Sequence, residues 1–389
     1  MSREYITQVC AGSCSASTFI LLCYFSRTIL AFLGGGQMST NAQEKLVTAP
    51  ALQDNQIPAP VQMLQIITNF WTTRAVYVLA KLGIPDLLKS GPKSAPELAE
   101  STGMHAPSMY RLLRALASAG ILQTEPDGRF GLTPMSELLV TDAPGSMRWL
   151  VVSELGQEHY PAWGNFMHSV KTGGIAFDDH FGMDVWNYFQ KNPEDAAVFN
   201  DSMSGMTAVV NEKITSLYDF SRFNKIVDVG GGHGGLITAI LKANPQAFGV
   251  LFDAEQVISG ARSKLQAAGI TDRCATIGGD FFQSVPAGGD AYIMKWIIHD
   301  WDDERATRIL KNIRSQIPQD GRVIIVDCVV PEGDDPDFSK FFDLNMMVMT
   351  GGKERTAREF DELLAAAGFR FLRVIPTDLP TSIVEAEPS

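Results

Sequence analysis

The chain has 389 residues, 45% of them hydrophobic and 20% charged, which are the proportions of an ordinary globular protein with room for two or three domains. Its formal net charge of −12 argues against a nucleic-acid partner, because phosphate binding requires clustered Lys and Arg. The five cysteines have no metal-ligand spacing. We therefore expect reduced thiols, a cytoplasmic location, no metal site, and no association with nucleic acid or membrane.

Residues 1–56 give the weakest structural signal of the chain. An apolar stretch at 18–33 is interrupted by Arg27 and is shorter than the ~20 residues that a membrane-spanning helix requires. A secretory or anchoring role is one interpretation of this stretch. We favour another, in which Met38 is the biological start, residues 1–37 are an upstream extension, and a polar disordered arm follows.

Residues 57–141 are predicted to form a small domain of helix, turn, helix and hairpin. Apolar side chains recur at helical spacing over 63–82. A capping box, S-A-P-E at 94–97, opens a short helix, and a second helix runs to Gly120. Two short strands joined by the Asp-Gly pair at 127–128 complete a winged helix.

A winged helix is often a DNA-binding unit, but the charge of this one favours another use. Residues 61–141 contain seven Lys/Arg and six Asp/Glu, a balance of 7 − 6 = +1, which is no phosphate-binding face. The long first helix, with Trp71 and Tyr77, is more apolar than one small domain needs. We therefore predict a homodimer built mainly by this region.

Residues 142–224 are predicted to be a helical connector rich in aromatic and Met side chains. Such side chains belong more often to a core than to a binding site. Their density beside a cofactor domain also makes them candidate walls of an apolar pocket, so we expect both roles. The candidates for contact with a flat substrate are Trp163, Phe177 and Met203.

The apolar run K-I-V-D-V at 225–229 ends in glycines and precedes an apolar helical pattern, which predicts a buried strand, a tight turn and a helix. Gly230 and Gly232 begin a G-x-G-x-x-G pattern typical of nucleotide-cofactor loops. The next strand ends in Asp253, placed to bind ribose hydroxyls. Asp228 favours S-adenosylmethionine over NAD. Alternatively, it is a structural carboxylate that caps the turn.

Residues 225–389 alternate strand and helix, which predicts a doubly wound, Rossmann-like α/β domain with a mostly parallel sheet. The predicted strands are 225–229, 248–253, 274–279, 291–297 and 322–330, with a helix at about 303–317. The polar residues that finish or follow these strands are Asp253, Asp280, His299 and Asp327. Because ligands of this fold lie at the carboxyl ends of the strands, one crevice is expected to collect these residues.

Four motifs together carry a family resemblance: M-K-W-I-I-H-D-W at 294–301, G-G-K-E-R-T at 351–356, the V-D-V-G-G-G loop, and the preceding winged helix. Over roughly residues 60–385 the chain resembles the caffeate and hydroxyindole type of S-adenosylmethionine-dependent O-methyltransferase, including bacterial secondary-metabolite enzymes. The resemblance implies S-adenosylmethionine as cofactor, an N-terminal winged-helix dimerisation domain, no metal, and a small aromatic or polyketide-like hydroxyl acceptor.

The same resemblance implies site residues. The histidine of the H-D-W motif, His299, is the expected general base, and Glu354 of G-G-K-E-R-T flanks it. Asp327 stands where plant members have a glutamate, one methylene longer. The cofactor contacts carried over are Asp228, Gly230, Gly232, Asp253, Asp280, Phe281, Lys295 and Trp301. Asn345 and Met349 are assigned to substrate binding together with the aromatic and Met side chains of the connector.

The chemistry is consistent with these roles. Methyl transfer from a sulfonium is an in-line displacement, so the protein must align donor and acceptor and remove a hydroxyl proton. A histidine can take that proton, while Asp327 and Glu354 fix its tautomer and stabilise the imidazolium. Activity is then expected to rise with pH through a pKa near that of free histidine, about 6.5.

Three alternatives stay open at this point. In the first, His299 is a capping or solvated residue before the helix at about 303–317. In the second, a protein of this fold binds S-adenosylmethionine but performs decarboxylation, hydroxylation or N-methylation. In the third, from a different functional class, the chain is a ligand-responsive winged-helix regulator.

Overall fold

The computed structural model describes residues 57–389, apart from the side chains at 204–206 and 208. The expectations for residues 1–56, including a start at Met38, lie outside the described residues. The described residues divide into two units, 57–72 and 73–389, with the boundary after Thr72 inside the first described helix. Between residues 57 and 389, no helix combines the length and the apolar composition needed to cross a membrane.

The winged-helix region has the order of elements predicted from its sequence. Its elements are α3 (Ala59–Lys81), α4 (Ile84–Leu88), α5 (Ala95–Thr102), α6 (Ala106–Ser118), β1 (Leu122–Thr124), β2 (Phe130–Leu132) and α7 (Pro134–Glu137). Ser94 and Glu97 form the predicted capping box at the start of α5. The short helix α4 was not predicted. Gly83, at its N-terminus, adopts a left-handed conformation that separates it from α3.

This region has one apolar surface that is buried in a core and another that is exposed. Leu79, Leu98, Leu113 and Phe130 are buried in one core beneath the hairpin. By contrast, the first half of α3 carries an exposed apolar stripe at helical spacing, which consists of Met63, Ile66, Ile67 and Trp71. An exposed stripe of this kind indicates an interaction surface.

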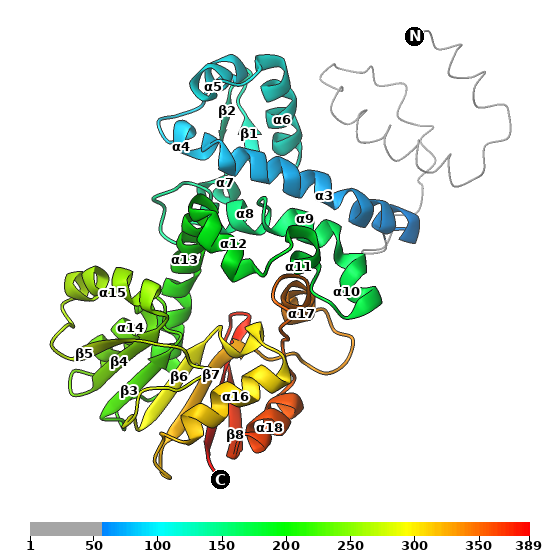
Figure 1. The fold of residues 1–389 in the computed structure, drawn as a ribbon. Coiled ribbons are helices and arrows are strands. Elements are labelled where there is room, and N and C mark those ends of the chain that lie inside the picture. Colours follow the sequence, from blue (N-terminus) through cyan, green and yellow to red (C-terminus); the bar gives the residue numbers. More distant parts are fainter. Residues whose placement is uncertain (1–56) are drawn as a thin grey trace, which may run out of the picture. The chain divides into compact units, whose positions relative to one another are not determined.

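The connector is helical, as predicted. It contains α8 (Arg148–Glu154), α9 (His159–Gly164), α10 (Phe166–Thr172), α11 (Ala176–Phe181), α12 (Val185–Lys191) and α13 (Pro193–Leu217). The long helix α13 leads into the first strand of the sheet and also packs against α8, α12 and α14. Figure 1 shows α9 and α11 beside α17, a helix from the other end of the chain.

The C-terminal domain is a doubly wound α/β fold, which confirms the predicted fold class. Its elements are β3 (Lys225–Val229), α14 (Gly235–Ala243), β4 (Phe248–Asp253), α15 (Glu255–Ala268), β5 (Cys274–Gly278), β6 (Ala291–Lys295), η2 (Ile298–Asp300), α16 (Asp303–Arg314), β7 (Arg322–Cys328), α17 (Phe338–Met349), α18 (Ala357–Ala366), β8 (Phe369–Pro376) and β9 (Thr381–Pro388). The sheet order is β5-β4-β3-β6-β7-β9-β8. β3 lies parallel to both β4 and β6. The order therefore reverses at β3, where ligands of this fold bind.

Helices cover both faces of this sheet because its central strands are apolar throughout. Successive side chains of a strand point to opposite faces. Accordingly, Ile226 lies in a core with α14 and α15, whereas Val227 lies in a second core with α16 and α18. Figure 1 shows α14 and α15 on one side of the sheet and α16 and α18 on the other.

The last two strands, β8 and β9, were not predicted. β9 inserts antiparallel between β7 and β8. Its buried Glu385 accepts hydrogen bonds from Tyr218 at 2.8 Å and Arg373 at 2.8 Å, and also pairs with Arg222. The two arginines supply the opposite charge that a buried carboxylate requires, and Tyr218 adds a neutral hydrogen bond. The strand thus fixes the edge of the sheet next to β7, whose end carries Asp327.

Candidate active site

The loop after β6 departs from the strand predicted over 291–297. β6 ends at Lys295, because Trp296 has φ +56°, a left-handed conformation that no other non-glycine residue adopts in the described part of the chain. The Trp296 N–H donates to the Val326 carbonyl at 3.0 Å, which holds this conformation. The chain then turns into the short 3-10 helix η2, which carries His299.

His299 is buried, and one ring nitrogen is held by a carboxylate. Nδ1 lies 2.6 Å from Glu354 Oε1, across 55 residues of sequence. Because an ionised carboxylate only accepts, Nδ1 carries the proton, so the neutral ring is left with Nε2 as its basic nitrogen. No described residue makes a hydrogen bond to Nε2, and Asp300 Oδ1 is 3.8 Å away. The ring centroid of Phe342 is 5.7 Å from that of His299.

Glu354 and Asp327, the two carboxylates predicted to orient the His299 ring, make different contacts. Glu354 bonds the ring, whereas both oxygens of Asp327 are buried without a hydrogen-bond partner among the described residues. Asp300 is a third nearby carboxylate, and it was missed although it belongs to the quoted H-D-W motif. Its position in the sequence, directly after the expected base His299, could have identified it.

These charges determine the protonation of His299. Burial lowers its pKa, but the negative charges of Glu354, Asp327 and Asp300 together raise it to about 10. Burial raises the pKa of Asp300 to about 6 and also raises that of Asp327. These neighbouring charges therefore favour the imidazolium form of His299 at neutral pH.

The G-G-K-E-R-T segment at 351–356 holds the loop after β6 that carries His299, here called the His299 loop, through a backbone hydrogen bond. The Lys353 N–H donates to the His299 carbonyl at 2.8 Å. The same carbonyl oxygen would lie 2.0 Å from a Cβ at position 352, so only Gly352 permits this approach. The ring and the backbone of His299 are thus held by neighbouring residues of one segment.

Arg355 of the same segment also holds the His299 loop, and sequence reasoning missed it. Its guanidinium is fully buried and donates to the carbonyls of Ile298 at 3.2 Å and Trp301 at 3.0 Å. It also bonds Asp303 Oδ1, at 2.9 Å from Nε and 2.7 Å from Nη2. Because the planar guanidinium presents five donors in a fixed fork, it fixes both ends of the loop at once.

The glycine loop lies at the carboxyl end of β3. Gly230 and Gly232 have φ of +70° and +58°, conformations that favour glycine. Asp253 Oδ2 accepts from the Gly232 N–H at 2.7 Å, and Oδ1 accepts from Ala254 N–H at 2.7 Å. A Cβ at Gly230 would meet Ile297 Cδ1 at 2.4 Å, so the glycine loop packs directly against the His299 loop.

Asp228, which is buried, and Lys295, which is half-buried, carry opposite charges beside this loop. Burial raises the pKa of Asp228 to about 7, although the charge of Lys295 opposes that effect. Burial likewise lowers the pKa of Lys295 to about 8. Lys295 Nζ donates to Thr207 Oγ1 at 2.9 Å and lies 4.1 Å from the Trp296 ring centroid.

These residues fit the cofactor that the resemblance implied. Asp228 Oδ2 is buried without a hydrogen-bond partner in the described structure, and so is Trp301 Nε1. Unused buried polar atoms of this kind suit a ligand that carries an ammonium group, ribose hydroxyls and an adenine ring. The carboxylate of Asp253, at the end of β4, is the expected ribose contact.

The expected adenine contacts form an aromatic cluster. The ring centroid of Trp301 lies 6.1 Å from that of Phe281 and 4.8 Å from that of Phe282. Asp280 Oδ1 accepts from the Phe282 N–H at 2.8 Å, which fixes the turn that follows β5. The predicted residues Asp280, Phe281 and Trp301 are therefore brought together.

The expected substrate residues lie on four different helices, α9, α11, α13 and α17. Trp163 on α9 donates from Nε1 to Asn345 Oδ1 on α17 at 2.7 Å. Phe177 is fully buried, with its ring centroid 4.5 Å from that of Phe181, so it belongs to the core of these helices. Met349 is also buried and packs in the same cluster, whereas Met203 on α13 is half-buried and outside it.

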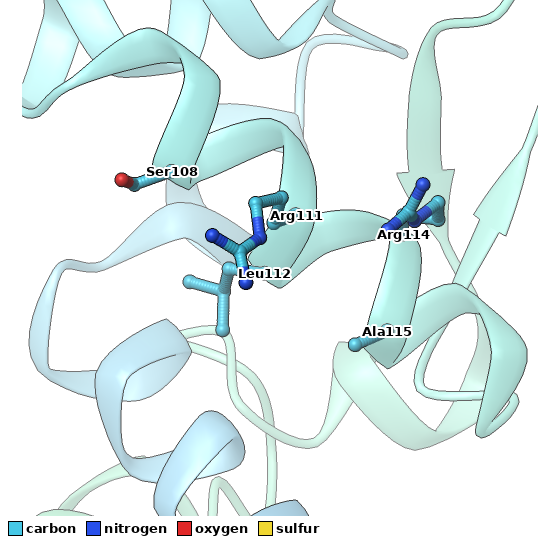
Figure 2. Close-up of a pocket in the computed structure, with 5 residues that line it drawn as sticks. All are labelled: Ser108, Arg111, Leu112, Arg114 and Ala115. Atoms are coloured by element: carbon cyan, nitrogen blue, oxygen red, sulfur yellow. The ribbon is translucent and has the colours of Figure 1, made fainter.

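A separate hollow lies on the winged-helix region. Figure 2 shows its lining, which comes from α6 and consists of Ser108, Arg111, Leu112, Arg114 and Ala115. It contains no carboxylate, histidine or thiol, and the group around His299 belongs to the other domain. The hollow is therefore not the candidate active site.

Comparison with known proteins agrees with the fold. An O-methyltransferase domain model matches residues 163–370, and an O-methyltransferase dimerisation domain model matches residues 64–142. The chain belongs to the S-adenosylmethionine-dependent O-methyltransferase family. It is an enzyme of this class, and S-adenosylmethionine is its cofactor.

Individual relatives and solved structures are similar to this chain over most of its length. The chain is similar to a phenazine O-methyltransferase of Lysobacter antibioticus, with 46% identity over 85% of this chain and 97% of that one. The solved structure of LaPhzM has a TM-score of 0.81 at 46% identity, over 86% of this chain and 100% of that one. The structure of NcsB1 with S-adenosylmethionine and 2-hydroxy-5-methyl naphthoic acid has a TM-score of 0.76 at 31% identity, over 86% and 100% of the two chains.

One relative is named for a different reaction, N-methylation. The chain is also similar to a phenazine-1-carboxylate N-methyltransferase of Pseudomonas aeruginosa, with 33% identity over 86% of this chain and 99% of that one. Family membership therefore establishes methyl transfer from S-adenosylmethionine without identifying the acceptor atom of this enzyme.

Proposed function

We propose that this enzyme transfers a methyl group from S-adenosylmethionine to a phenolic hydroxyl of a flat, fused-ring acceptor of the phenazine type, with His299 as general base. The observation that carries the proposal is the geometry of His299. Glu354 holds Nδ1, and no described residue bonds Nε2. The similarity to a phenazine O-methyltransferase supports the acceptor class.

Each residue has a role in this reaction. When bound, S-adenosylmethionine supplies an electrophilic methyl group on a sulfonium. Asp228, Asp253 and Lys295 are proposed to bind its charged and hydroxyl groups, and Trp301, Asp280 and Phe281 its adenine. His299 Nε2 accepts the proton from the acceptor hydroxyl, while Glu354 stabilises the imidazolium that results. Alignment of donor and acceptor supplies the rest of the rate enhancement.

The acidity of His299 suits a phenol. A phenol has a pKa of about 10, and the surrounding carboxylates raise the pKa of His299 to about the same value. A proton shared between groups of matched pKa moves with little free-energy change in either direction. The neutral imidazole becomes more abundant as pH rises toward 10, so the pH dependence expected near 6.5 from sequence is moved to alkaline pH.

The test is an assay with methyl-labelled S-adenosylmethionine and a set of hydroxyphenazines and hydroxynaphthoates. We expect labelled methyl ethers, identified by mass and by the carbon chemical shift of an O-methyl group. An enzyme that binds S-adenosylmethionine but methylates no hydroxyl in this set would contradict the proposal.

N-methylation of a ring nitrogen is the second candidate, and it is favoured by the similarity to a phenazine-1-carboxylate N-methyltransferase together with the raised pKa of His299. An imidazolium at neutral pH cannot accept a proton, and an unprotonated ring nitrogen has none to lose. If this candidate is correct, the label appears as an N-methyl group, and His299→Ala leaves the rate nearly unchanged.

The assembly belongs to the same proposal. The exposed stripe of α3 and the match to a dimerisation domain support a homodimer. We propose the domain boundaries predicted from sequence: a winged-helix dimerisation domain at 57–141, a connector and pocket region at 142–224, and a catalytic domain at 225–389.

A further inference from the structure

His233 carries the only side chain within residues 230–235 of the glycine loop, since the other five residues are glycines. Its ring is half-buried. The proposed function assigns this ring no role, although it directly follows Gly232, whose N–H donates to Asp253. The contacts of His233 therefore bear on how the glycine loop is held.

The ring of His233 lies against α15, the helix that follows β4 and lies with α14 on one side of the sheet (Figure 1). Lys264 Nζ on α15 is 3.0 Å from His233 Nδ1. Gly260 precedes Lys264 by four residues, so both face the ring from the same side of the helix. A Cβ at Gly260 would lie 3.0 Å from Nε2 and 3.4 Å from Cδ2. The ring therefore occupies the space that a side chain at Gly260 would take.

The contact with Lys264 fixes the protonation state of the ring. An ammonium group can only donate, so His233 Nδ1 accepts and carries no proton. The ring is then neutral, with its proton on Nε2. An imidazolium is positively charged and has a donor on each nitrogen, so it could not keep this contact. The observed geometry thus belongs to the neutral form of His233.

Asp253 connects this ring to the cofactor site. Its Oδ2 accepts from the Gly232 N–H at 2.7 Å, and its carboxylate is the proposed ribose contact. In the described structure, the charged groups that face His233 are Lys264 on α15 and Asp253 at the end of β4. A cation at position 233 is repelled by Lys264 and attracted by Asp253. It would therefore compete with Gly232 and with the ribose hydroxyls for this carboxylate.

We propose that His233 is a positioning residue that holds the glycine loop for S-adenosylmethionine only while its ring is neutral, so that protonation of His233 weakens cofactor binding. This inference depends on the cofactor and not on the identity of the acceptor. Its consequence is a cofactor affinity that falls in acid, separately from any effect of pH on His299.

The neighbours of His233 determine the pH range of this effect. Burial lowers the pKa of His233 and the charge of Lys264 lowers it further, while Asp253 opposes both. The affinity should therefore fall at a pH below the pKa of free histidine, about 6.5, and stay constant with respect to this group above it. Because protonation costs one hydrogen bond, we expect roughly fivefold weaker binding by the fully protonated form.

The experiment measures the Kd of S-adenosylmethionine by calorimetry at pH values of about 8 and about 5.5, on either side of the histidine range. His233→Asn keeps an amide oxygen that can accept from Lys264 but cannot be protonated. Between the two pH values, the parent should lose about two- to fivefold more affinity than this variant, and the two should bind similarly at the higher pH. Other titrating groups of the site act in both proteins and cancel in the comparison.

Two further variants test the charge argument. Lys264→Met removes the positive charge from this exposed position, so it should raise the pKa of His233 and move the loss of affinity to higher pH. His105→Asn is the matched control, because His105 is exposed at the N-terminus of α6 and asparagine is a good helix cap. This control should show the pH dependence of the parent. Thermal unfolding verifies that each variant is folded.

A purely structural role of His233 predicts a different result. His233→Asn would then weaken binding by the same factor at both pH values, and its pH dependence would equal that of the parent, which refutes the inference. An affinity change that stays at the same pH in Lys264→Met also refutes it. Because none of these measurements requires an acceptor, failure to find O-methylation would leave this inference standing, and its own failure would leave the proposed function standing.

Discussion

His299 is the residue on which the proposed chemistry depends. Replacing it with Ala should lower kcat by roughly 10²- to 10⁴-fold while the affinity for S-adenosylmethionine barely changes, because the base acts on the proton of the acceptor. Steady-state kinetics and calorimetry measure the two quantities. Near-parental turnover of a hydroxyl acceptor by His299→Ala would refute acid–base catalysis.

The carboxylates around His299 predict the direction of a pH shift. The parent kcat should rise with pH toward about 10, because the raised pKa keeps the imidazole protonated at lower pH. Glu354→Gln removes the largest raising charge and should move this limb to lower pH, with a larger rate loss than Asp327→Asn, whose carboxylate makes no bond to the ring. A limb that stays in place in Glu354→Gln would contradict this account.

At the scale of elements, the His299 loop is held by the segment that follows α17. Arg355→Lys keeps the charge but loses the fork that bonds the carbonyls of Ile298 and Trp301. We expect a lower kcat, and also weaker S-adenosylmethionine binding, because both ends of the loop loosen. Arg358→Lys, on the exposed face of α18, is the control and should behave as the parent. Equal behaviour of the two variants would show that the fork is not needed.

At the scale of the whole molecule, the exposed stripe of α3 predicts a homodimer. Light scattering at micromolar concentration should give twice the chain mass. Ile66→Glu places a charge within the stripe and should shift the protein toward monomer, because a buried unpaired charge is costly. Gln65→Glu adds the same charge outside the stripe and should not. A parent protein that is monomeric would refute the prediction.

The fold was largely predictable because its signals are local. The capping box at Ser94, the glycines of the β3 turn and the alternation of strand and helix each lie within a few residues of one another. Two departures came from long-range context. β8 and β9 were missed because their place in the sheet depends on the antiparallel pairing of β9 with β7, and β6 ended early because Trp296 adopts a left-handed conformation.

By itself, the sequence determined the fold class and the cofactor loop, and it singled out His299 as the candidate base, since each rests on residues adjacent in the chain. Tertiary structure decided which groups meet. Glu354 rather than Asp327 bonds His299, Asp300 adds a third charge, and Arg355 clamps the loop. Trp163 and Asn345 meet across 182 residues. Such pairings and the pKa shifts that follow depend on burial and distance in space, which no spacing along the chain encodes.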